Sequence, residues 1–228
     1  MVGVNKATME NKLIGQLAAV MPAGVEIPTP IRQLYEWIEQ RGLYADNEDH
    51  RIGFLYPEQD LRASWTDEGR RGGTTIELVA MGNANLKYWF GAEHEEVSRR
   101  LCVFGQTGAE GSQCAFWVSE SGALKIVHLG SGSGSLLNCV LADNAVDFLR
   151  LLAIGYDEIC WNEGFDSPPN EENPDFRVEP NAEFQAWVKS TFNVEVPQTA
   201  SEIVKHPSDI GDEDSEDEFC RWCQQFTA

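Results

Sequence analysis

Residues 143–161 read DNAVDFLRLLAIGYDEICW. Asp143 can cap the N-terminus of a helix, because its carboxylate can accept hydrogen bonds from the first free backbone N–H groups. The apolar positions that follow are Val146, Phe148, Leu149, Leu151, Leu152, Ile154, Tyr156 and Ile159. A helix that is apolar over so much of its circumference must be buried on more than one side. The stretch therefore predicts a central buried helix, and nothing in it is typical of catalytic machinery.

The residues before this helix predict a sheet preceded by helices. Helices are expected at 11–20 and from residue 29 to a stop at Gly42, where a glycine suits the end of a helix. Seven short segments then have the composition of strands: 52–56, 74–80, 87–90, 101–104, 113–118, 124–129 and 136–141. Because tight turns separate several of them, and parallel strands need long crossovers, we expect antiparallel pairing.

The clearest pair is a β-hairpin formed by residues 113–119 and 123–129, joined by a short Glu-Ser-Gly turn. Alternation puts Trp117 on the face opposite Phe116. His128 lies in the second strand, where a hydrogen-bonded histidine within the sheet or core is expected. The Gly-Ser-rich segment 130–135 lacks the Lys-Ser/Thr that completes a phosphate-binding loop, and predicts a flexible connection between two strands.

Three aromatic residues in a row form one of the expected strands. Tyr88, Trp89 and Phe90 would place at least one ring on each face of the sheet. Burial is the more common fate of such rings, although exposed ones mark interfaces.

The C-terminal part begins with an acidic, proline-rich loop at 162–180 and a second helix capped by Asn181. The run 211–218 contains only acids and one serine after its glycine, and is expected to be solvated. A final aromatic patch at Phe219, Trp222 and Phe226 is expected to dock as a short helix.

This order of elements predicts an α+β fold: an antiparallel sheet of about six strands with helices packed on one face. We expect one domain over residues 1–210. Its N-terminal helices lie in 11–41, its sheet in 51–141 and its C-terminal helices in 143–192. Residues 211–228 are expected to form an acidic tail with a short aromatic segment.

The charge balance is strongly acidic. The chain has 17 lysines and arginines against 37 aspartates and glutamates, a net charge of −20. Between Asp157 and Glu218 there are 18 acidic residues and only three basic ones. Such a surface repels phosphate backbones and anionic lipids, so direct binding to nucleic acid or membrane is disfavoured. It attracts a basic protein partner, although the excess can also serve solubility alone.

Six cysteines are too few for a disulfide scaffold of this length, which favours a reducing compartment. The N-terminus lacks a basic segment leading into an apolar one, and no apolar run approaches 18 residues. We therefore expect a cytoplasmic protein without a classical export signal. The sequence sets no oligomeric state.

Candidate chemistry is sparse. Cys220 and Cys223 form a C-x-x-C, which suggests thiol redox or metal binding. The acidic run before them would raise a thiolate pKa, and no second pair of metal ligands has matching spacing. A helical aromatic cluster with incidental cysteines is the simpler interpretation. No catalytic residue, metal or cofactor is predicted.

The second half of the chain resembles the SUKH superfamily (Smi/Knr-like proteins). The similar segments are 130–141 leading into ADNAVDFLRLLAIGYDEI at 142–159, and FQAWV at 184–188 followed by Phe192, Val196-Pro197 and ASEIV at 200–204. Together they span residues 124–205, a little over a third of the chain. These are packing motifs, which carry more about fold than about function.

The resemblance implies an α+β domain without enzymatic activity. Many bacterial members of the superfamily are immunity proteins that bind and neutralise a toxin, often a nuclease, and others are regulatory interaction modules. An acidic surface suits an inhibitor of a basic nuclease. The alternatives are a regulatory scaffold that docks partners through 211–218, and a thiol-redox or metal protein using Cys220 and Cys223.

Partner surfaces differ between members of the superfamily, so no binding residue transfers by position. We expect the partner to contact the end of the central helix, where acids and a tryptophan follow one another. The expected contact residues are Asp157, Glu158, Trp161, Glu163 and Asp166.

Overall fold

The computed structural model describes residues 11–60, 69–171 and 177–227. The helices are α1 (Lys12–Val20), α2 (Thr29–Arg41), α4 (Leu86–Trp89), α5 (Glu95–Arg100), α6 (Ala145–Ile154), α7 (Ala182–Phe192), the 3-10 helix η1 (Ala200–Glu202) and α8 (Glu218–Gln224). The strands are β1 (Tyr44–Asp46), β2 (Arg51–Gly53), β3 (Gly69–Arg71), β4 (Glu77–Gly82), β5 (Leu101–Gln106), β6 (Gln113–Val118), β7 (Leu124–Leu129), β8 (Val140–Ala142) and β9 (Arg177–Glu179).

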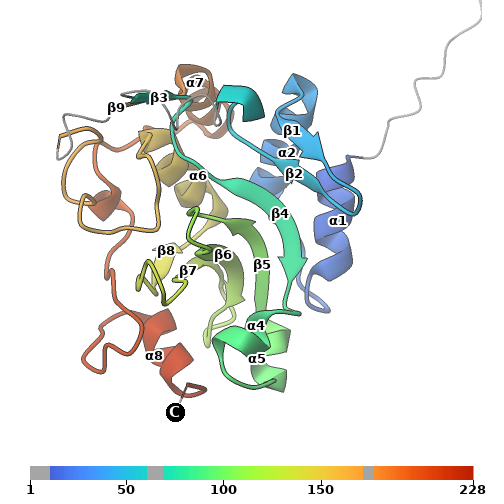
Figure 1. The fold of residues 1–228 in the computed structure, drawn as a ribbon, viewed down its shortest axis with the longest axis vertical. Helices are drawn as coiled ribbons and strands as arrows, with labels where there is room; N and C mark the ends of the chain where they lie inside the picture. The colour runs from blue at the N-terminus through green and yellow to red at the C-terminus, as the bar shows by residue number, and fades with distance from the viewer. Residues whose placement is uncertain (1–10, 61–68, 172–176, 228) are drawn as a thin grey trace, which may run out of the picture.

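Seven of these strands form one antiparallel sheet in the order β1-β2-β4-β5-β6-β7-β8, and β3 pairs with β9 in a small parallel sheet (Figure 1). The α+β class is confirmed, with seven strands in the main sheet where about six were expected. The expected hairpin is β6 and β7, paired in register from Gln113 opposite Leu129 to Val118 opposite Leu124. No helix among the described residues has the length and apolar character needed to cross a bilayer.

The four longest helices cover one face of the sheet. Phe104 and Phe116 stack there with ring centroids 4.1 Å apart, and Phe148 from α6 meets Phe104 edge-on at 5.7 Å. Seven of the ten residues of α6 are buried, which confirms the central buried helix. Its cap differs from the expectation: Asn144 accepts the Asp147 N–H at 3.0 Å. Asp143 lies one residue too early to cap, and pairs with Lys125 instead.

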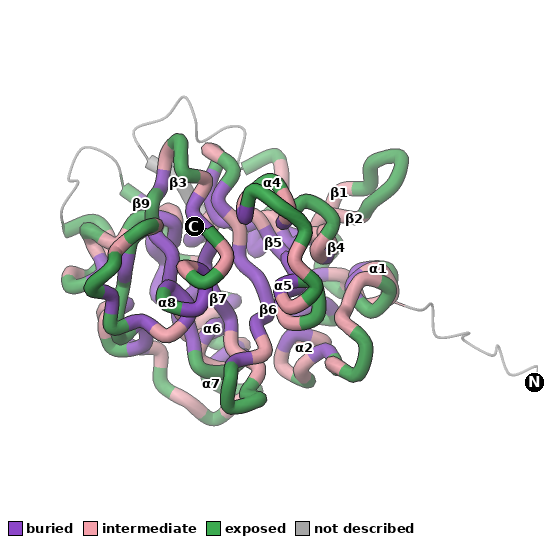
Figure 2. The backbone as a smooth tube through the Cα atoms, turned by 90° about the horizontal axis from the view of Figure 1, so that it is seen from below, coloured by how far each residue is buried: buried purple, intermediate pink, exposed green. Residues whose placement is uncertain are grey.

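Helices were expected on one face only, but the opposite face also carries a smaller core to which α4, α5 and α8 contribute. Trp117 is fully buried there, with its ring 5.2 Å from Phe219 and 5.6 Å from Trp222. Those two residues belong to α8, so the aromatic patch docks as a short helix, as expected. Figure 2 shows α8, α4 and α5 on one side of the strands and α2, α6 and α7 on the other.

The expected strand at 87–90 is wrong, because this segment forms the helical turn α4. Backbone hydrogen bonds from Leu86 N to Asn83 O and from Tyr88 N to Asn85 O wind this part of the chain into a turn in place of an extended strand. Tyr88 is 78% exposed, and the Trp89 indole N–H donates to the Gly130 carbonyl at 2.8 Å.

Other strands are shorter than expected or shifted along the chain. β2 covers only the start of 52–56, β4 begins three residues after the start of 74–80, and β8 covers only the end of 136–141. Leu137 instead forms an isolated bridge with Asp209. The connection 130–135 does link β7 to β8.

The acidic run 211–218 is not wholly solvated, because Ser215 and Asp217 are buried. Asp217 caps α8 by accepting the Cys220 N–H at 2.8 Å, and its second oxygen accepts the Val140 N–H at 3.0 Å. A buried carboxylate is tolerated where backbone donors satisfy it. The C-terminal residues are thereby attached to β8, while the predicted domain boundary at residue 210 stays a prediction.

Replacing Asp217 with alanine is expected to destabilise the protein by about 2–3 kcal/mol, because it removes a helix cap and leaves the Val140 N–H unsatisfied. Asp217→Asn keeps only one carbonyl oxygen for the two donors and should lower the free energy of unfolding by about half as much. Urea-induced unfolding followed by circular dichroism measures both. Equal stability of the wild type and the alanine variant would contradict the contacts described.

His128 is a fully buried, hydrogen-bonded histidine, as expected. Its Nδ1 lies 2.7 Å from the Leu137 carbonyl oxygen, which can only accept, so Nδ1 carries the proton. Nε2 then accepts from the Thr107 hydroxyl at 2.9 Å. Burial lowers the pKa of His128 to about 4, because the charged ring would lose its hydration.

A neutral buried histidine makes stability depend on pH. The His128 side chain binds a proton near pH 6.5 in the unfolded chain and only near pH 4 in the folded chain. Its contribution to the free energy of unfolding is therefore complete above pH 6.5 and is lost as the pH falls. When the pH is lowered from 7.0 to 5.5, the free energy of unfolding of the wild type should fall by about 1 kcal/mol more than that of His128→Gln. Urea titrations at both pH values test this, and parallel losses would contradict it.

Candidate binding site

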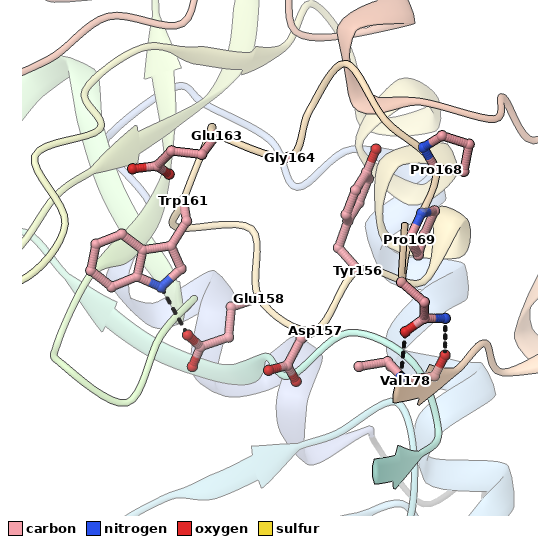
Figure 3. A pocket seen from close by; sticks show the side chains of 10 residues that line it. Tyr156, Asp157, Glu158, Trp161, Glu163, Gly164, Pro168, Pro169 and Val178 are labelled. Carbon is pink, nitrogen blue, oxygen red and sulfur yellow. Dashed lines mark hydrogen bonds between the residues drawn. The ribbon is translucent and has the colours of Figure 1, made fainter. Parts of the chain in front are cut away.

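The loop that follows α6 encloses a surface hollow of about 380 Å³ (Figure 3). The hollow is lined by Tyr156, Asp157, Glu158, Trp161, Glu163, Gly164, Pro168, Pro169, Asn170 and Val178. Four of the five residues expected to contact a partner are among them. Asp166 is exposed on the same loop but does not line the hollow.

The chain turns sharply where α6 ends. Gly155 adopts a positive φ of 96°, and a Cβ there would come within 3.1 Å of the Pro180 Cα. Only glycine accepts both this conformation and the close approach. The turn sends the loop away from the helix axis and places Tyr156 at the wall of the hollow.

The Tyr156 wall is held by two hydrogen bonds. The hydroxyl donates to the Ser167 carbonyl at 2.7 Å and accepts the Ala200 N–H at 3.0 Å. The ring packs 5.9 Å from the buried ring of Phe165. Tyr156 therefore connects the start of the loop to Ser167, in the middle of the loop, and to η1.

The far end of the loop is fastened to β9. Asn170, with a φ of 71°, accepts the Val178 N–H at 2.6 Å and donates to the Val178 carbonyl at 2.9 Å. Asparagine tolerates the left-handed region, and its amide can pair with a strand as a backbone group would. This contact closes the hollow on the side of Pro168 and Pro169 (Figure 3).

Trp161 and Glu158 form the opposite side. The Trp161 side chain lies at the surface with the residue 43% exposed, and its indole N–H donates to Glu158 Oε2 at 3.0 Å. Glu158 Oε1 accepts the Ala109 N–H at 3.3 Å. These hydrogen bonds hold the Glu158 carboxylate and the Trp161 ring in place at the rim of the hollow. Large apolar residues that stay exposed in the described part of the chain are Tyr88, Leu136 and Trp161.

The hollow has one sign of charge. Its lining includes the carboxylates of Asp157, Glu158 and Glu163, and none of the described lining residues is basic. Within the residues that the structure describes, Glu163 forms no ion pair. A second hollow of about 310 Å³, beside α8, differs because Lys125 and Lys205 line it together with acids. The first hollow is therefore suited to a cation.

The lining offers binding groups but few reactive ones. No serine, cysteine, histidine or lysine is among the described residues that form it. Cys160 lies behind the rim, buried, with its thiol 3.6 Å from Glu158 Oε2. Burial, together with Glu158 and Glu110, raises the pKa of this thiol and disfavours its reactive thiolate form.

Cys220 and Cys223 are also buried, within α8. Burial raises the pKa of both thiols, as the acidic neighbours also do. No group of three or more His, Cys, Asp or Glu side chains in the described ranges is arranged to hold a metal ion. Their thiols donate weak hydrogen bonds, from Cys220 to the Asp209 carbonyl at 3.4 Å and from Cys223 to Asn138 Oδ1 at 4.0 Å, and Cys223 also packs in the second core.

Six further residues line the hollow but were not among the expected contact residues: Tyr156, Gly164, Pro168, Pro169, Asn170 and Val178. The Pro-Pro-Asn sequence at 168–170 is a turn signal that could have indicated where the loop reverses. Val178 has no such signal, because it reaches the hollow only through the pairing of β9 with β3.

Comparison of the chain with protein-family models, with curated proteins and with solved structures finds no match. The resemblance of residues 124–205 to the SUKH superfamily therefore stays a prediction.

Proposed function

We propose that this protein is a non-enzymatic, cytoplasmic binding protein of the SUKH type, which binds and neutralises a basic protein toxin as an immunity protein does. The observation that supports this most directly is the hollow after α6, where an exposed tryptophan stands beside the carboxylates of Glu158 and Glu163, and where the described lining residues include no basic side chain. Tryptophan is among the residues that contribute most to binding energy at protein interfaces.

The charge of the whole chain supports a basic partner. A net charge of −20 produces a long-range field that accelerates the approach of a positively charged protein and disfavours acidic ones. At the interface itself, the carboxylates around Trp161 would favour the correct partner over others.

The same carboxylates suit a toxin that acts on nucleic acid. A nuclease carries lysines and arginines where it contacts phosphates. Carboxylates at this surface would pair with those lysines and arginines in place of the phosphates. The bound protein would then cover the nucleic-acid-binding cleft of the nuclease. Inhibition then follows from occlusion and needs no chemistry.

A scaffold that uses 211–218 as a free docking tail receives no support from the contacts. Asp217 joins α8 to β8, and Ser215 donates to the Ser208 hydroxyl at 2.7 Å. Ser215 and Asp217 would both have to leave buried positions before a partner could bind them.

Co-expression with the products of neighbouring genes tests the proposal. We expect one of those products to be toxic alone, to be tolerated with this protein, and to co-purify with it. The purified pair should bind more weakly at 500 mM than at 50 mM salt, because screening reduces attraction between exposed charges. Absence of rescue and of binding at both salt concentrations would reject the pairing.

A charge-neutralised variant makes the test specific to the hollow. Glu163→Gln should weaken binding at low salt, whereas Glu120→Gln, in the exposed β6–β7 turn, should leave it unchanged. Equal effects of the two variants would mean that net charge alone, and not this site, drives association.

A further inference from the structure

The hollow after α6 combines a flat aromatic surface with acceptors at its edge. Trp161, Glu158 and Glu163 lie on one side, and Tyr156, Pro168 and Pro169 on the other (Figure 3). Its volume of about 380 Å³ is at the small end of the range for ligand pockets. It suits one long side chain better than a large ligand.

The acceptors retain capacity for a ligand. Each oxygen of a carboxylate has about two acceptor positions. Glu158 Oε2 takes the Trp161 indole N–H and lies 3.6 Å from the Cys160 thiol, whereas Oε1 takes only the Ala109 N–H, which leaves a position on Oε1. Glu163 is exposed, and no hydrogen bond or ion pair in the described residues occupies its carboxylate.

We propose that this hollow is a receptor for a single arginine side chain presented by the partner. The guanidinium would lie over the Trp161 indole and donate to Glu158 and Glu163. This inference rests on the proposed function, because it names the chemistry by which the same site recognises its partner.

Arginine fits these groups better than lysine does. The guanidinium is planar, stacks on aromatic faces and has five N–H donors that match carboxylates in pairs. Lysine offers a compact, strongly hydrated charge without a flat surface. The bond between the Trp161 indole and Glu158 already holds the ring and the carboxylate together, so binding does not have to order them.

The aromatic and proline rings that line the hollow add to the preference for arginine. A cation over an indole gains about 0.5–2 kcal/mol, more when water is excluded. Pro168, Pro169 and the hydrogen-bonded Tyr156 face the same space and carry no charge. An arginine stem could therefore lie against apolar atoms while its head reaches the carboxylates.

A titration of the full ¹⁵N-labelled chain with Nα-acetyl-arginine amide tests this inference. The probe should shift the Trp161 indole N–H resonance, assigned from its loss in Trp161→Phe, and the Glu163 and Gly164 amides, with a dissociation constant of roughly 1–10 mM. The citrulline counterpart, which has the same shape but no charge, should bind at least about tenfold more weakly. The lysine counterpart should fall between them.

Variants locate the effect in the hollow. Glu163→Gln should weaken arginine binding by about threefold to tenfold, and Glu120→Gln should leave it unchanged. Trp161→Ala should abolish saturation at the Glu163 and Gly164 amides while the rest of the spectrum stays in place.

The inference is overturned if the arginine derivative shifts none of these resonances, or if citrulline shifts them with equal affinity. It is also overturned if lysine binds as tightly as arginine. Because the titration contains no partner protein, its failure leaves the co-expression result unaffected, so the two proposals can fail separately.

Discussion

Replacement of Trp117 by alanine is expected to lower the free energy of unfolding by about 3–5 kcal/mol, the usual cost of removing a large buried aromatic side chain. Trp117 is fully buried at the centre of the second core. Its ring contacts Phe219 and Trp222, so the cavity would also loosen α8. Urea-induced unfolding measures the loss of stability.

Trp117→Phe provides the matched control. The Trp117 indole nitrogen is buried without a hydrogen-bond partner among the described residues. Phenylalanine keeps an aromatic ring and removes this unsatisfied donor, so its cost should be less than half that of alanine. A loss below about 1 kcal/mol for Trp117→Ala would contradict the packing of α8 on the sheet.

Replacement of Trp161 by alanine is expected to weaken binding of the proposed basic partner by about 100-fold. Tryptophan truncations at interface centres cost more than about 2 kcal/mol, and each 1.4 kcal/mol is a factor of ten. The substitution also frees the Glu158 carboxylate from the indole N–H. Isothermal titration calorimetry with the purified partner measures the change, which should lie mainly in the dissociation rate.

Tyr88→Ala provides the comparison for an exposed aromatic residue outside the site. Tyr88 is more exposed than Trp161, and it lies on α4 and does not line the hollow after α6. Its removal should leave affinity unchanged. If Tyr88→Ala weakened binding as much as Trp161→Ala, the partner surface would lie elsewhere. Neither substitution should lower stability by more than about 0.5 kcal/mol.

Long periodic segments were predictable from the sequence. The apolar face of α6 and the alternation in β6 and β7 repeat over enough residues to distinguish helix from strand. The strands β1, β3 and β9 have three residues each, too few for a period to show. β3 and β9 also depend on partners distant in the chain, as in the pairing of Gly69 with Arg177, whereas β1 pairs with the neighbouring strand β2.

Local competition explains the wrong assignments. At 87–90 the aromatic composition favours a strand, but local turn hydrogen bonds that begin at Asn83 hold the chain in α4. At 143–144 either residue can cap a helix, and the sequence does not distinguish a start one residue later. The burial of Asp217 could not be predicted from its acidic surroundings, since it depends on the Val140 N–H, 77 residues away.

The site was predictable where it follows one element. Asp157, Glu158, Trp161 and Glu163 follow α6 directly, so a single loop brings them to the hollow. Asp166 belongs to the same loop but is not one of the lining residues. The proline wall and Val178 come from the return of the loop to β9, which no local pattern indicates.

The attachment of the C-terminal segment has a consequence for how this protein can associate with others. Asn138 N donates to Ser208 O, Ile210 N to Leu136 O, and Val140 N to Asp217. These contacts occupy backbone groups of Val140, at the start of β8, and of Leu136 and Asn138 just before it, which could otherwise pair with an additional strand. Recognition by β-strand addition, and sheet-to-sheet joining of two copies, are therefore blocked at this margin. Along this margin, a partner must identify the molecule by its side chains.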